Sequence, residues 1–367
     1  MTGPSVPLVD LHIQHDRIAD EVRSGFDRVL ENTAFVLGPA VEEFERAYAT
    51  FCGVAHCRGL GNGTDAVEVA LRSCDIGAGD EVIVPANTFV ATVEAVVRAG
   101  ATPVLVDCAE EFLIDPERIA AARSARTRAV LPVHLYGQMA PMAAVADAAG
   151  PDVVVIEDAA QSQGARQAGS RSGSVGRVAA TSFYPGKNLG AYGDAGAVTT
   201  DDEGIADRVA RLRNHGGSRR YEHREIGFNS RMDGLQGVVL TAKLAHLDAW
   251  NAERGVAAGH YQELLANRED VVLPSVVAGN EHVWHLYVVR VPRRDDVVAA
   301  LNAAGIGAGI HYPQPVHRLP AFPGLGGPGA FPVAERLAAE ILSLPIYPGI
   351  AREQQERVVD ELVKALG

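Results

Sequence analysis

One lysine, Lys187, stands in a stretch whose composition suits covalent chemistry on a small ligand. The stretch reads Ala180-Thr181-Ser182-Phe183-Tyr184-Pro185-Gly186-Lys187-Asn188-Leu189-Gly190. Six glycines fall between residues 173 and 196, so the backbone around the lysine can bend and approach a ligand closely. A lysine amine can form a Schiff base with a carbonyl compound. A solvent-exposed lysine in a glycine-rich loop would have the same pattern, so the rest of the chain must decide.

An anion site is predicted where Gly61-Asn62-Gly63-Thr64 joins an expected strand to an expected helix. Gly63 and Thr64 would stand at the helix N-terminus, where free N–H groups and the helix dipole favour a phosphate. Capping of the helix by Thr64 or Asn62 uses the same geometry. Both interpretations stay open from the local sequence.

Two further chemical groups follow expected strands. Phe89 comes soon after the strand at residues 81–85, where its ring could face a ligand or pack in the core. Asp158 comes directly after an apolar strand at residues 153–156, so its carboxylate is poorly solvated and needs a cationic or N–H partner. Asp158 is therefore a candidate site residue, with helix capping as the alternative.

These groups would meet if the strands form one parallel sheet, because ligands bind beyond the carboxyl ends of such strands. The edge would then hold an anion site, an aromatic face, a carboxylate and an amine. Pyridoxal phosphate needs this set for its phosphate, its ring, its ring nitrogen and its aldehyde. The order of the four groups along the chain therefore favours a pyridoxal phosphate site.

The glycines at positions 59, 61 and 63 also suggest a dinucleotide site, but the match fails in detail. Thr64 stands where the third glycine of the G-x-G-x-x-G fingerprint belongs. The acidic pair Asp80-Glu81 precedes the next strand instead of ending it. An NAD-dependent oxidoreductase is kept only as a rival hypothesis.

The elements that must position these groups alternate regularly from residue 54 to residue 200. Strands are predicted at 54–59, 81–85, 102–106, 129–134, 153–156, 179–183 and 195–200, and the last is a candidate antiparallel strand. Helices of about a dozen residues separate the first five, at 64–74, 88–98, from 115 and at 139–149. Short valine-rich and isoleucine-rich runs between helices are typical of βαβ units and a mostly parallel sheet covered on both faces.

Helices also flank this region. Two precede it, at 16–31 and from Pro39, and two follow, at 205–214 and as one long helix over 232–266. The domain boundary is placed in the long helix, which gives a large domain at 1–248 and a smaller α+β domain at 249–367. In the smaller domain we expect strands at 283–291 and after 307–311, and helices at 295–304, 334–342 and 354–366.

Composition narrows the class of protein. The net charge of −13 disfavours nucleic acid and anionic membrane as partners, since both require a cationic surface. No apolar run approaches the ~20 residues that span a bilayer. The four cysteines show no metal-binding spacing, so we expect no metal, and their scatter indicates a reducing compartment. The start at Met1-Thr2-Gly3-Pro4 has no signal-peptide pattern, and a cytoplasmic protein is expected.

Motifs over nearly the whole chain resemble the DegT/DnrJ/EryC1/StrS family of sugar aminotransferases that use pyridoxal phosphate and have the aspartate aminotransferase fold (fold type I). The matching segments are Gly38-Pro39 with Phe44-Glu45, residues 61–66, 79–85, 132–137, 157–161, 182–190, 227–233 and 309–313. Against the family pattern, Met232 stands where leucine is commoner and Gly186 where a small hydroxyl residue is commoner.

The resemblance implies roles for cofactor-binding residues. Lys187 would bind the cofactor covalently and then move the proton between substrate and cofactor, and Asp158 would pair with the ring nitrogen. The remaining cofactor contacts would be Gln161 near the ring hydroxyl, Phe89 on the ring face, and Gly63, Thr64 and Ser182 on the phosphate. Asn229 would reach the phosphate of the neighbouring subunit, which implies a homodimer with shared sites.

The resemblance also implies a substrate and a pocket for it. The reaction would move an amine from an amino acid, with glutamate as donor, to a nucleotide-linked keto-sugar. Some family members are dehydratases with histidine in place of the lysine, so Lys187 favours amino transfer. The sugar-nucleotide pocket would be lined by Tyr184, the loop at 219–221 with Arg219 and Tyr221, Arg231, His311, Tyr312 and His317.

Variants within the motifs look closest to members that aminate C-3 of a dTDP-3-keto-6-deoxyhexose. These variants are Gly61-Asn62-Gly63-Thr64-Asp65-Ala66, Asp158-Ala159-Ala160-Gln161 and Tyr221-Glu222-His223 before residues 227–231. The alternative is amination at C-4 of a dTDP- or UDP-linked 4-keto sugar. A regulatory protein that binds the cofactor or a sugar nucleotide on the same fold, without catalysis, is the non-enzyme alternative.

Overall fold

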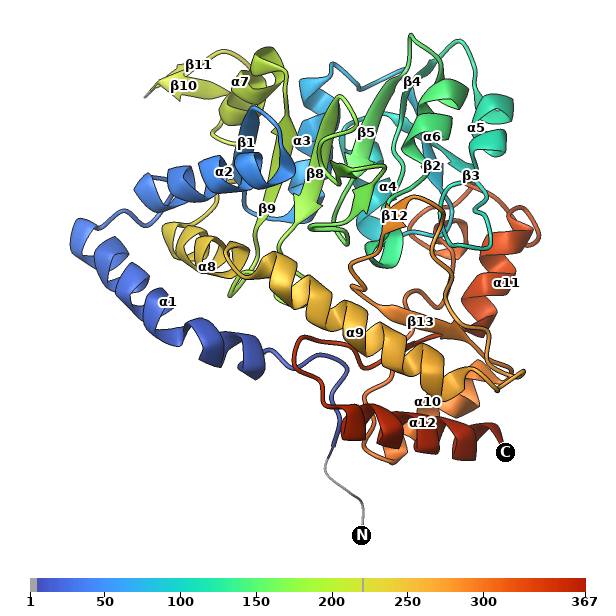
Figure 1. The fold of residues 1–367 in the computed structure, drawn as a ribbon. Helices are drawn as coiled ribbons and strands as arrows, with labels where there is room; N and C mark the ends of the chain where they lie inside the picture. The colour runs from blue at the N-terminus through green and yellow to red at the C-terminus, as the bar shows by residue number, and fades with distance from the viewer. Residues whose placement is uncertain (1–4, 220) are drawn as a thin grey trace.

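A seven-stranded sheet organises the larger part of the chain (Figure 1). The computed structural model describes residues 5–219 and 221–367. The strand order is β1-β9-β8-β5-β4-β2-β3. The strands are β1 (His56–Leu60), β2 (Glu81–Pro85), β3 (Thr102–Val106), β4 (Thr127–Val130), β5 (Val154–Asp158), β8 (Val178–Ser182) and β9 (Gly196–Thr200). All seven lie where the sequence predicts strands, which confirms the α/β class.

Strand direction places the functional groups at one edge. Five strands, β3, β2, β4, β5 and β8, are mutually parallel. β9 is antiparallel to both β8 and β1, as predicted for residues 195–200, so β1 points the same way as the five. The carboxyl ends of β1, β2, β4, β5 and β8 therefore share one edge.

Helices cover both faces of this sheet. Alternate residues of β2 show this directly: Val82 and Val84 pack in one core cluster, and Ile83 packs in another. The first face carries α3 (Gly63–Ser73), α4 (Val90–Arg98) and α7 (Glu203–Leu212). The second carries α5 (Pro116–Ala122) and α6 (Met142–Ala149), and, beside β9, α2 (Pro39–Cys52) and α8 (Gly234–Leu244). Strands buried on both faces explain the continuous apolar runs in the sequence.

The long helix predicted over 232–266 is two helices, and that prediction is wrong at its centre. α8 ends at Leu244, and α9 (Leu247–Leu265) begins three residues later. Residues 245 and 246 are alanine and histidine, so no glycine or proline marks the break. Packing imposes it: α8 lies against α2 and α1 (His12–Asn32), while α9 continues to the C-terminal part, as Figure 1 shows.

The C-terminal part has the predicted α+β character with one exchange of elements. β13 (Tyr287–Arg290) pairs antiparallel with β14 (Ile341–Leu344). The sequence had assigned residues 341 and 342 to the end of a helix, but α11 (Pro332–Glu340) stops before them. The second strand expected after residues 307–311 is absent there among the described residues: Gly309 only bridges Ser343. The residues of β14 are all buried, and in the sequence they form a short apolar run. Such a run has no periodicity that distinguishes a buried strand from the end of a helix.

The remaining C-terminal helices surround this strand pair. They are α10 (Arg294–Ala303) and α12 (Arg352–Leu366), which pack on each other and, through α12, on α9. The N-terminal end joins the same core, since Val6 bridges Ile306. The minor strands are β6 (Arg166–Gln167), β7 (Ser170–Arg171), β10 (Gly217–Arg219), β11 (Glu222–His223) and β12 (Asn280–Glu281), and short 3-10 turns lie at Leu135–Gly137 and Val316–Arg318.

Three general findings concern the described residues. None of their helices is long and apolar enough to span a bilayer. They contain no cluster of His, Cys, Asp and Glu suited to a metal ion. All four cysteines are free thiols. Residues 1–4, on which the absence of a signal peptide was judged, lie outside the described part, as does residue 220 of the predicted 219–221 loop.

Candidate active site

A cavity of about 440 Å³ lies at the carboxyl edge of the large sheet. Its wall is formed from segments that follow β1, β2, β4, β5 and β8 and from two segments of the C-terminal part, and it is completed by Leu8 and Val9 near the N-terminus and by Asp194 just before β9. Ten of the predicted site residues line it: Gly63, Thr64, Phe89, Asp158, Gln161, Ser182, Tyr184, Lys187, His311 and Tyr312. The parallel sheet thus brings together residues that are up to 249 positions apart in the chain, from Gly63 to Tyr312 (312 − 63).

Lys187 projects from a tight loop after β8. Its backbone N–H donates to the carbonyl of Tyr184 over 2.8 Å, which closes the turn. The loop returns so closely that a Cβ on Gly190 would lie 2.2 Å from the Pro185 carbonyl oxygen, so only glycine fits there. Burial lowers the pKa of the Lys187 amine to about 8, and the negative charge of Asp158 partly opposes that shift. A neutral amine is therefore accessible near physiological pH.

Asp158 is the last residue of β5 and is 4% exposed. The hydroxyl of Thr92 donates to its Oδ2 over 2.8 Å, and the backbone N–H of Ala160 donates to its Oδ1 over 3.1 Å. Since Thr92 uses its proton on Asp158, the hydroxyl of Thr88 donates in turn to Thr92, over 2.8 Å. Burial raises the pKa of Asp158, and the two hydrogen bonds and Lys187 act against that rise.

Lys187 and Asp158 do not form an ion pair, although both line the cavity. The carboxylate is held from behind by Thr92 and Ala160, and the amine has no side-chain hydrogen bond within the described residues. The space between a fixed carboxylate and a free amine is therefore open to a flat molecule that contacts both.

The N-terminus of α3 forms the polar end of the cavity. Asn62 caps the helix, since its Oδ1 accepts the N–H of Asp65 over 2.8 Å. Asn62 is therefore the cap, and the N–H groups of Gly63 and Thr64 have no partner in the first helical turn. A Cβ on Gly63 would lie 2.4 Å from the Cβ of Ser182, so glycine allows the helix end and the β8 loop to meet. This end can hold a phosphate.

An aromatic wall covers the cavity. The rings of Phe89 and Tyr312 lie with their centroids 5.2 Å apart and tilted by 36°. The Tyr312 hydroxyl accepts from Nε2 of Gln161 over 3.0 Å, and Oε1 of Gln161 accepts the backbone N–H of Tyr136 over 2.7 Å. Gln161 therefore fixes Tyr312 to the sheet edge, and half-exposed Phe89 presents its ring as a platform.

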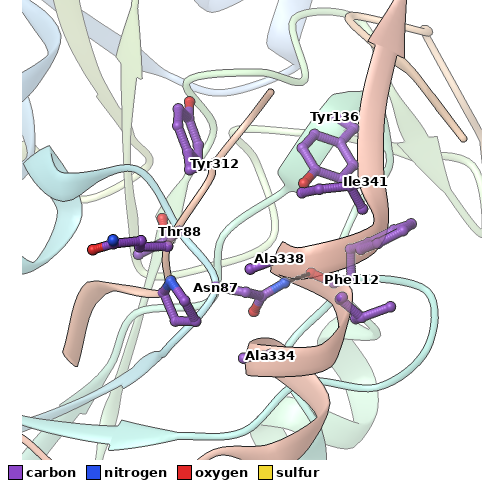
Figure 2. Close-up of a pocket in the computed structure, with 11 residues that line it drawn as sticks. Asn87, Thr88, Phe112, Tyr136, Tyr312, Ala334, Ala338 and Ile341 are labelled. Carbon is purple, nitrogen blue, oxygen red and sulfur yellow. Dashed lines mark hydrogen bonds between the residues drawn. The ribbon is translucent and has the colours of Figure 1, made fainter. Parts of the chain in front are cut away.

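A much smaller cavity of about 10 Å³ lies directly behind this wall, and Figure 2 shows its lining. Thr88 and Tyr312 line both cavities. Asn87 donates from Nδ2 to the carbonyl of Phe112 over 2.7 Å, which is the dashed line in Figure 2. The hydroxyl of Tyr136 donates to the carbonyl of His311. This packing supports the aromatic wall from the side of α11.

Five predicted site residues do not line the cavity of this chain. Arg219, Tyr221 and Asn229 are exposed, with Tyr221 80% exposed. Arg231 donates to Oδ1 of Asn214 over 3.1 Å. His317 is buried, 3.0 Å from Oε1 of Glu335. Their predicted roles therefore depend on a second subunit or a larger ligand.

Two cavity residues were missed by the sequence analysis. Thr92 lies one helical turn beyond Thr88, and this i, i+4 pair of hydroxyls near the end of β2 was an available signal. His285 comes from a segment just before β13, far along the chain, and no local pattern marks it. Its pKa lies well below the ordinary histidine value, because it is buried and cations such as Lys187 lie nearby.

The residues fit a ligand with a phosphate, a flat ring and a reactive carbonyl. The α3 N-terminus can take the phosphate, Phe89 the ring face, Asp158 a protonated ring nitrogen and Lys187 the carbonyl carbon. This is the donor set of an aminotransferase site.

Comparison with known proteins agrees with this class. The family model of the DegT/DnrJ/EryC1/StrS aminotransferase family matches residues 16–363. The chain belongs to this family.

Two relatives illustrate its range. A protein of Streptomyces venezuelae named dTDP-3-amino-3,4,6-trideoxy-alpha-D-glucose transaminase is 45% identical over 360 residues, which cover 97% of this chain and 95% of the relative. A Saccharopolyspora erythraea protein named erythromycin biosynthesis sensory transduction protein EryC1 is also 45% identical, over 97% of this chain and 98% of the relative.

Two solved structures share the fold. The crystal structure of S. venezuelae DesV in complex with a ketimine intermediate superposes with a TM-score of 0.95, at 44% identity, covering 99% of this chain and 98% of DesV. NtdA from Bacillus subtilis with bound cofactor PMP gives a TM-score of 0.90, at 31% identity, covering 100% of this chain and 85% of NtdA. The predicted fold, that of the pyridoxal phosphate-dependent aminotransferases, is confirmed.

Proposed function

We propose that this chain is a pyridoxal 5′-phosphate-dependent aminotransferase. It would move an amino group from L-glutamate to C-3 of a dTDP-linked 3-keto-6-deoxyhexose. The observation that carries the proposal is one cavity in which the Lys187 amine and the fixed Asp158 carboxylate face open space beside the N-terminus of α3.

Each wall of the cavity has a task in this reaction. Gly63, Thr64 and Ser182 would hold the phosphate, Phe89 would cover the ring, and Gln161 would lie at its edge. Asp158 would hold a proton on the ring nitrogen, since a carboxylate fixed by Thr92 and Ala160 is an acceptor for a cationic N–H. Bound pyridoxal phosphate supplies an electron sink for the carbon that loses its proton.

Lys187 would carry that proton. Because burial lowers its pKa to about 8, a substantial fraction of the amine is neutral and can accept a proton near neutral pH. The resulting ammonium can then return the proton to a neighbouring carbon. The tight loop from Tyr184 to Gly190 keeps the amine on the cavity side of the sheet edge.

The substrate assignment is supported by relatives and by the shape of the site. The S. venezuelae relative is named for a dTDP-linked 3-amino sugar. Tyr184, His311 and Tyr312 also line the cavity, and a sugar nucleotide would lie against them. Amination at C-4 of a dTDP- or UDP-linked 4-keto sugar is the second candidate.

A homodimer would complete the site. Asn229, Arg219, Tyr221 and Arg231 do not line the cavity of their own chain, and we propose that they serve that of the neighbouring subunit. We also retain the division into domains at residues 1–248 and 249–367, and a cytoplasmic location, which the four free thiols support.

The test is a paired absorbance and transfer assay. Protein purified with pyridoxal phosphate should be yellow, L-glutamate should bleach the colour, and a dTDP-linked 3-keto-6-deoxyhexose should restore it with formation of the 3-amino sugar. A panel of dTDP- and UDP-linked 3-keto and 4-keto sugars decides the position and the base. Colour that no amino donor bleaches would instead support a regulatory protein, the function that the name of the S. erythraea relative suggests.

A further inference from the structure

A chain of buried amides connects the residue after Lys187 to a histidine on the cavity wall. Nδ2 of Asn251, on α9, donates to the carbonyl of Gln163 over 2.9 Å. Oδ1 of Asn251 accepts from Nδ2 of Asn188 over 2.8 Å, and the same Nδ2 donates to the carbonyl of Val283 over 2.8 Å. Oδ1 of Asn188 then lies 3.2 Å from Nδ1 of His285.

This chain fixes the tautomer of His285. The backbone carbonyls of Gln163 and Val283 can only accept, so both amide orientations are determined. Oδ1 of Asn188 is consequently an acceptor, and Nδ1 of His285 must carry the proton. Because burial and nearby cations keep the pKa of His285 low, the ring is neutral and Nε2 has a free lone pair.

The free Nε2 atom opens onto the active-site cavity. It has no hydrogen-bond partner within the described part of the chain, and it is not among the sealed polar atoms that lack one. His285 and Lys187 line the same cavity. The Lys187 amine, a donor, also lacks a side-chain partner among these residues, so an unpaired donor and an unpaired acceptor share one wall.

We propose that Nε2 of His285 accepts a hydrogen bond from the Lys187 amine during the reaction and holds that amine where it carries the proton. The role rests on the aminotransferase function proposed above for Lys187. His285 is then a positioning residue, contributed by the C-terminal part to the lysine in the loop after β8. The amide chain has the task of presenting the lone pair and keeping the N–H turned away.

The connection through Asn188 favours Lys187 over a sugar hydroxyl as the donor. Asn188 is the chain neighbour of Lys187 and is 1% exposed, with three hydrogen-bond contacts. The position of the histidine ring is therefore fixed relative to the loop that carries Lys187. A residue meant to recognise only the sugar would need no such attachment to this loop.

Two substitutions of His285 separate the Nε2 acceptor from the Nδ1 hydrogen bond to Asn188. His285→Asn places an amide nitrogen where Nδ1 was, so the bond to Asn188 can be kept while the Nε2 acceptor is lost. His285→Gln places an amide oxygen near the position of Nε2, so the acceptor can be kept while the bond to Asn188 is lost. A purely structural role predicts that the Asn variant behaves better, and the proposed role predicts that the Gln variant does. His260→Asn is the matched control, since His260 bonds Gln355 between α9 and α12, away from the cavity.

The first readout is independent of catalysis. In protein freed of cofactor, reductive methylation of Lys187 is followed by mass spectrometry as a function of pH. Loss of an acceptor destabilises the ammonium, so the midpoint should move down by about one pH unit in His285→Asn and stay near wild type in His285→Gln. Charged and titratable groups surround these two residues, and all variants retain them. They are Asp158, Arg254, His282 and His311, together with Tyr184, Asp194 and Tyr312 on the wall of the same cavity.

Turnover and the ring itself supply the other readouts. We expect kcat to fall about tenfold in His285→Asn with little change in KM for the sugar, and less in His285→Gln. Nitrogen NMR of labelled histidine should show His285, identified by its absence from the variant, protonated at Nδ1 alone. An unmoved methylation midpoint, a higher KM with unchanged kcat, or a ring protonated at Nε2 would each overturn the proposal. Because methylation and NMR need no transfer activity, they test it even if the proposed function fails.

Discussion

Two lysines with lowered pKa values show what makes a lysine functional in this fold. Of the three lysines in the chain, Lys364 is exposed and pairs with Glu361. Lys243 is buried, and Lys187 is half-buried with its amine enclosed by the walls of the cavity. Burial lowers the pKa of each enclosed amine to about 8. The pKa alone therefore does not distinguish them.

Their surroundings do. Lys243, on α8, donates to the carbonyl of Gly190 over 2.7 Å and lies 4.9 Å from the centre of the Tyr192 ring. Lys187 has no such bond and faces the cavity, where the negative charge of Asp158 raises the pKa of its amine. The amine of Lys243 is already hydrogen-bonded inside the protein, and through Gly190 it stabilises the end of the loop that carries Lys187. A free amine opposite a fixed carboxylate is the feature that indicates catalysis.

The largest expected effect is the difference in transfer activity between a Lys187 variant and a Lys243 variant. Lys187→Ala should lower transfer by at least ~10⁴-fold and remove the visible band of the bound cofactor, since both the covalent attachment and the proton carrier are lost. Lys243→Met should keep the band and lose less than about tenfold in kcat, because its amine does not reach the cavity. Stopped-flow turnover and absorbance spectra give both values. Equal losses in the two variants would show that the comparison of their surroundings is wrong.

The carboxylate that only Lys187 faces is the next target. Asp158→Asn keeps the shape and can keep the bond to Thr92, but a neutral amide does not hold a proton on a ring nitrogen. We expect kcat to fall by about 10²-fold or more while cofactor binding weakens less. Thr92→Val is the companion change, which removes one donor to Asp158. Undiminished turnover in Asp158→Asn would remove the carboxylate from the mechanism.

Most of this edge could be predicted from the sequence, because each group follows a strand closely. Phe89, Asp158 and Lys187 each come within a few residues of an apolar run, and parallel strands bring such positions together whatever the details of packing. At the N-terminus of α3 the sequence left open both anion binding against plain capping and Asn62 against Thr64 as the cap. Side-chain geometry identifies Asn62 as the cap, and anion binding by Gly63 and Thr64 stays a prediction.

What the sequence left open depends on contacts between distant segments. His285 enters the site because α9 and the segment at 283–285 fold back on the Lys187 loop, and nothing near residue 285 signals this. The strand β14 was mistaken for a helix end, since its partner β13 lies about fifty residues away. The break between α8 and α9 likewise comes from packing without any glycine or proline.

A smaller effect concerns the stability role of Lys243. Lys243→Met removes the donor to Gly190 and leaves that buried carbonyl without a partner, which costs about 1–3 kcal/mol. Relief of the desolvated ammonium acts in the opposite direction and is of similar size, so the net change near pH 7 should not exceed about 1 kcal/mol. Urea unfolding of cofactor-free protein measures it. A gain in stability would mean that burial of the charge outweighs the hydrogen bond.

The last effect is the pH dependence of that same difference. The pKa of Lys243 is about 8 in the folded chain against an ordinary value of 10.5, so the folded state binds fewer protons than the unfolded state between these pH values. The penalty for the buried ammonium is fully present below pH 8, and it is relieved as pH rises toward 10.5. Wild type should therefore gain stability relative to Lys243→Met by at most ~1.4 kcal/mol per pH unit across this window. Lys187 titrates in the same window but is present in both proteins, so its contribution cancels. A stability difference that stays constant from pH 7 to 10.5 would show that Lys243 keeps its ordinary pKa and that burial does not make the two lysines alike.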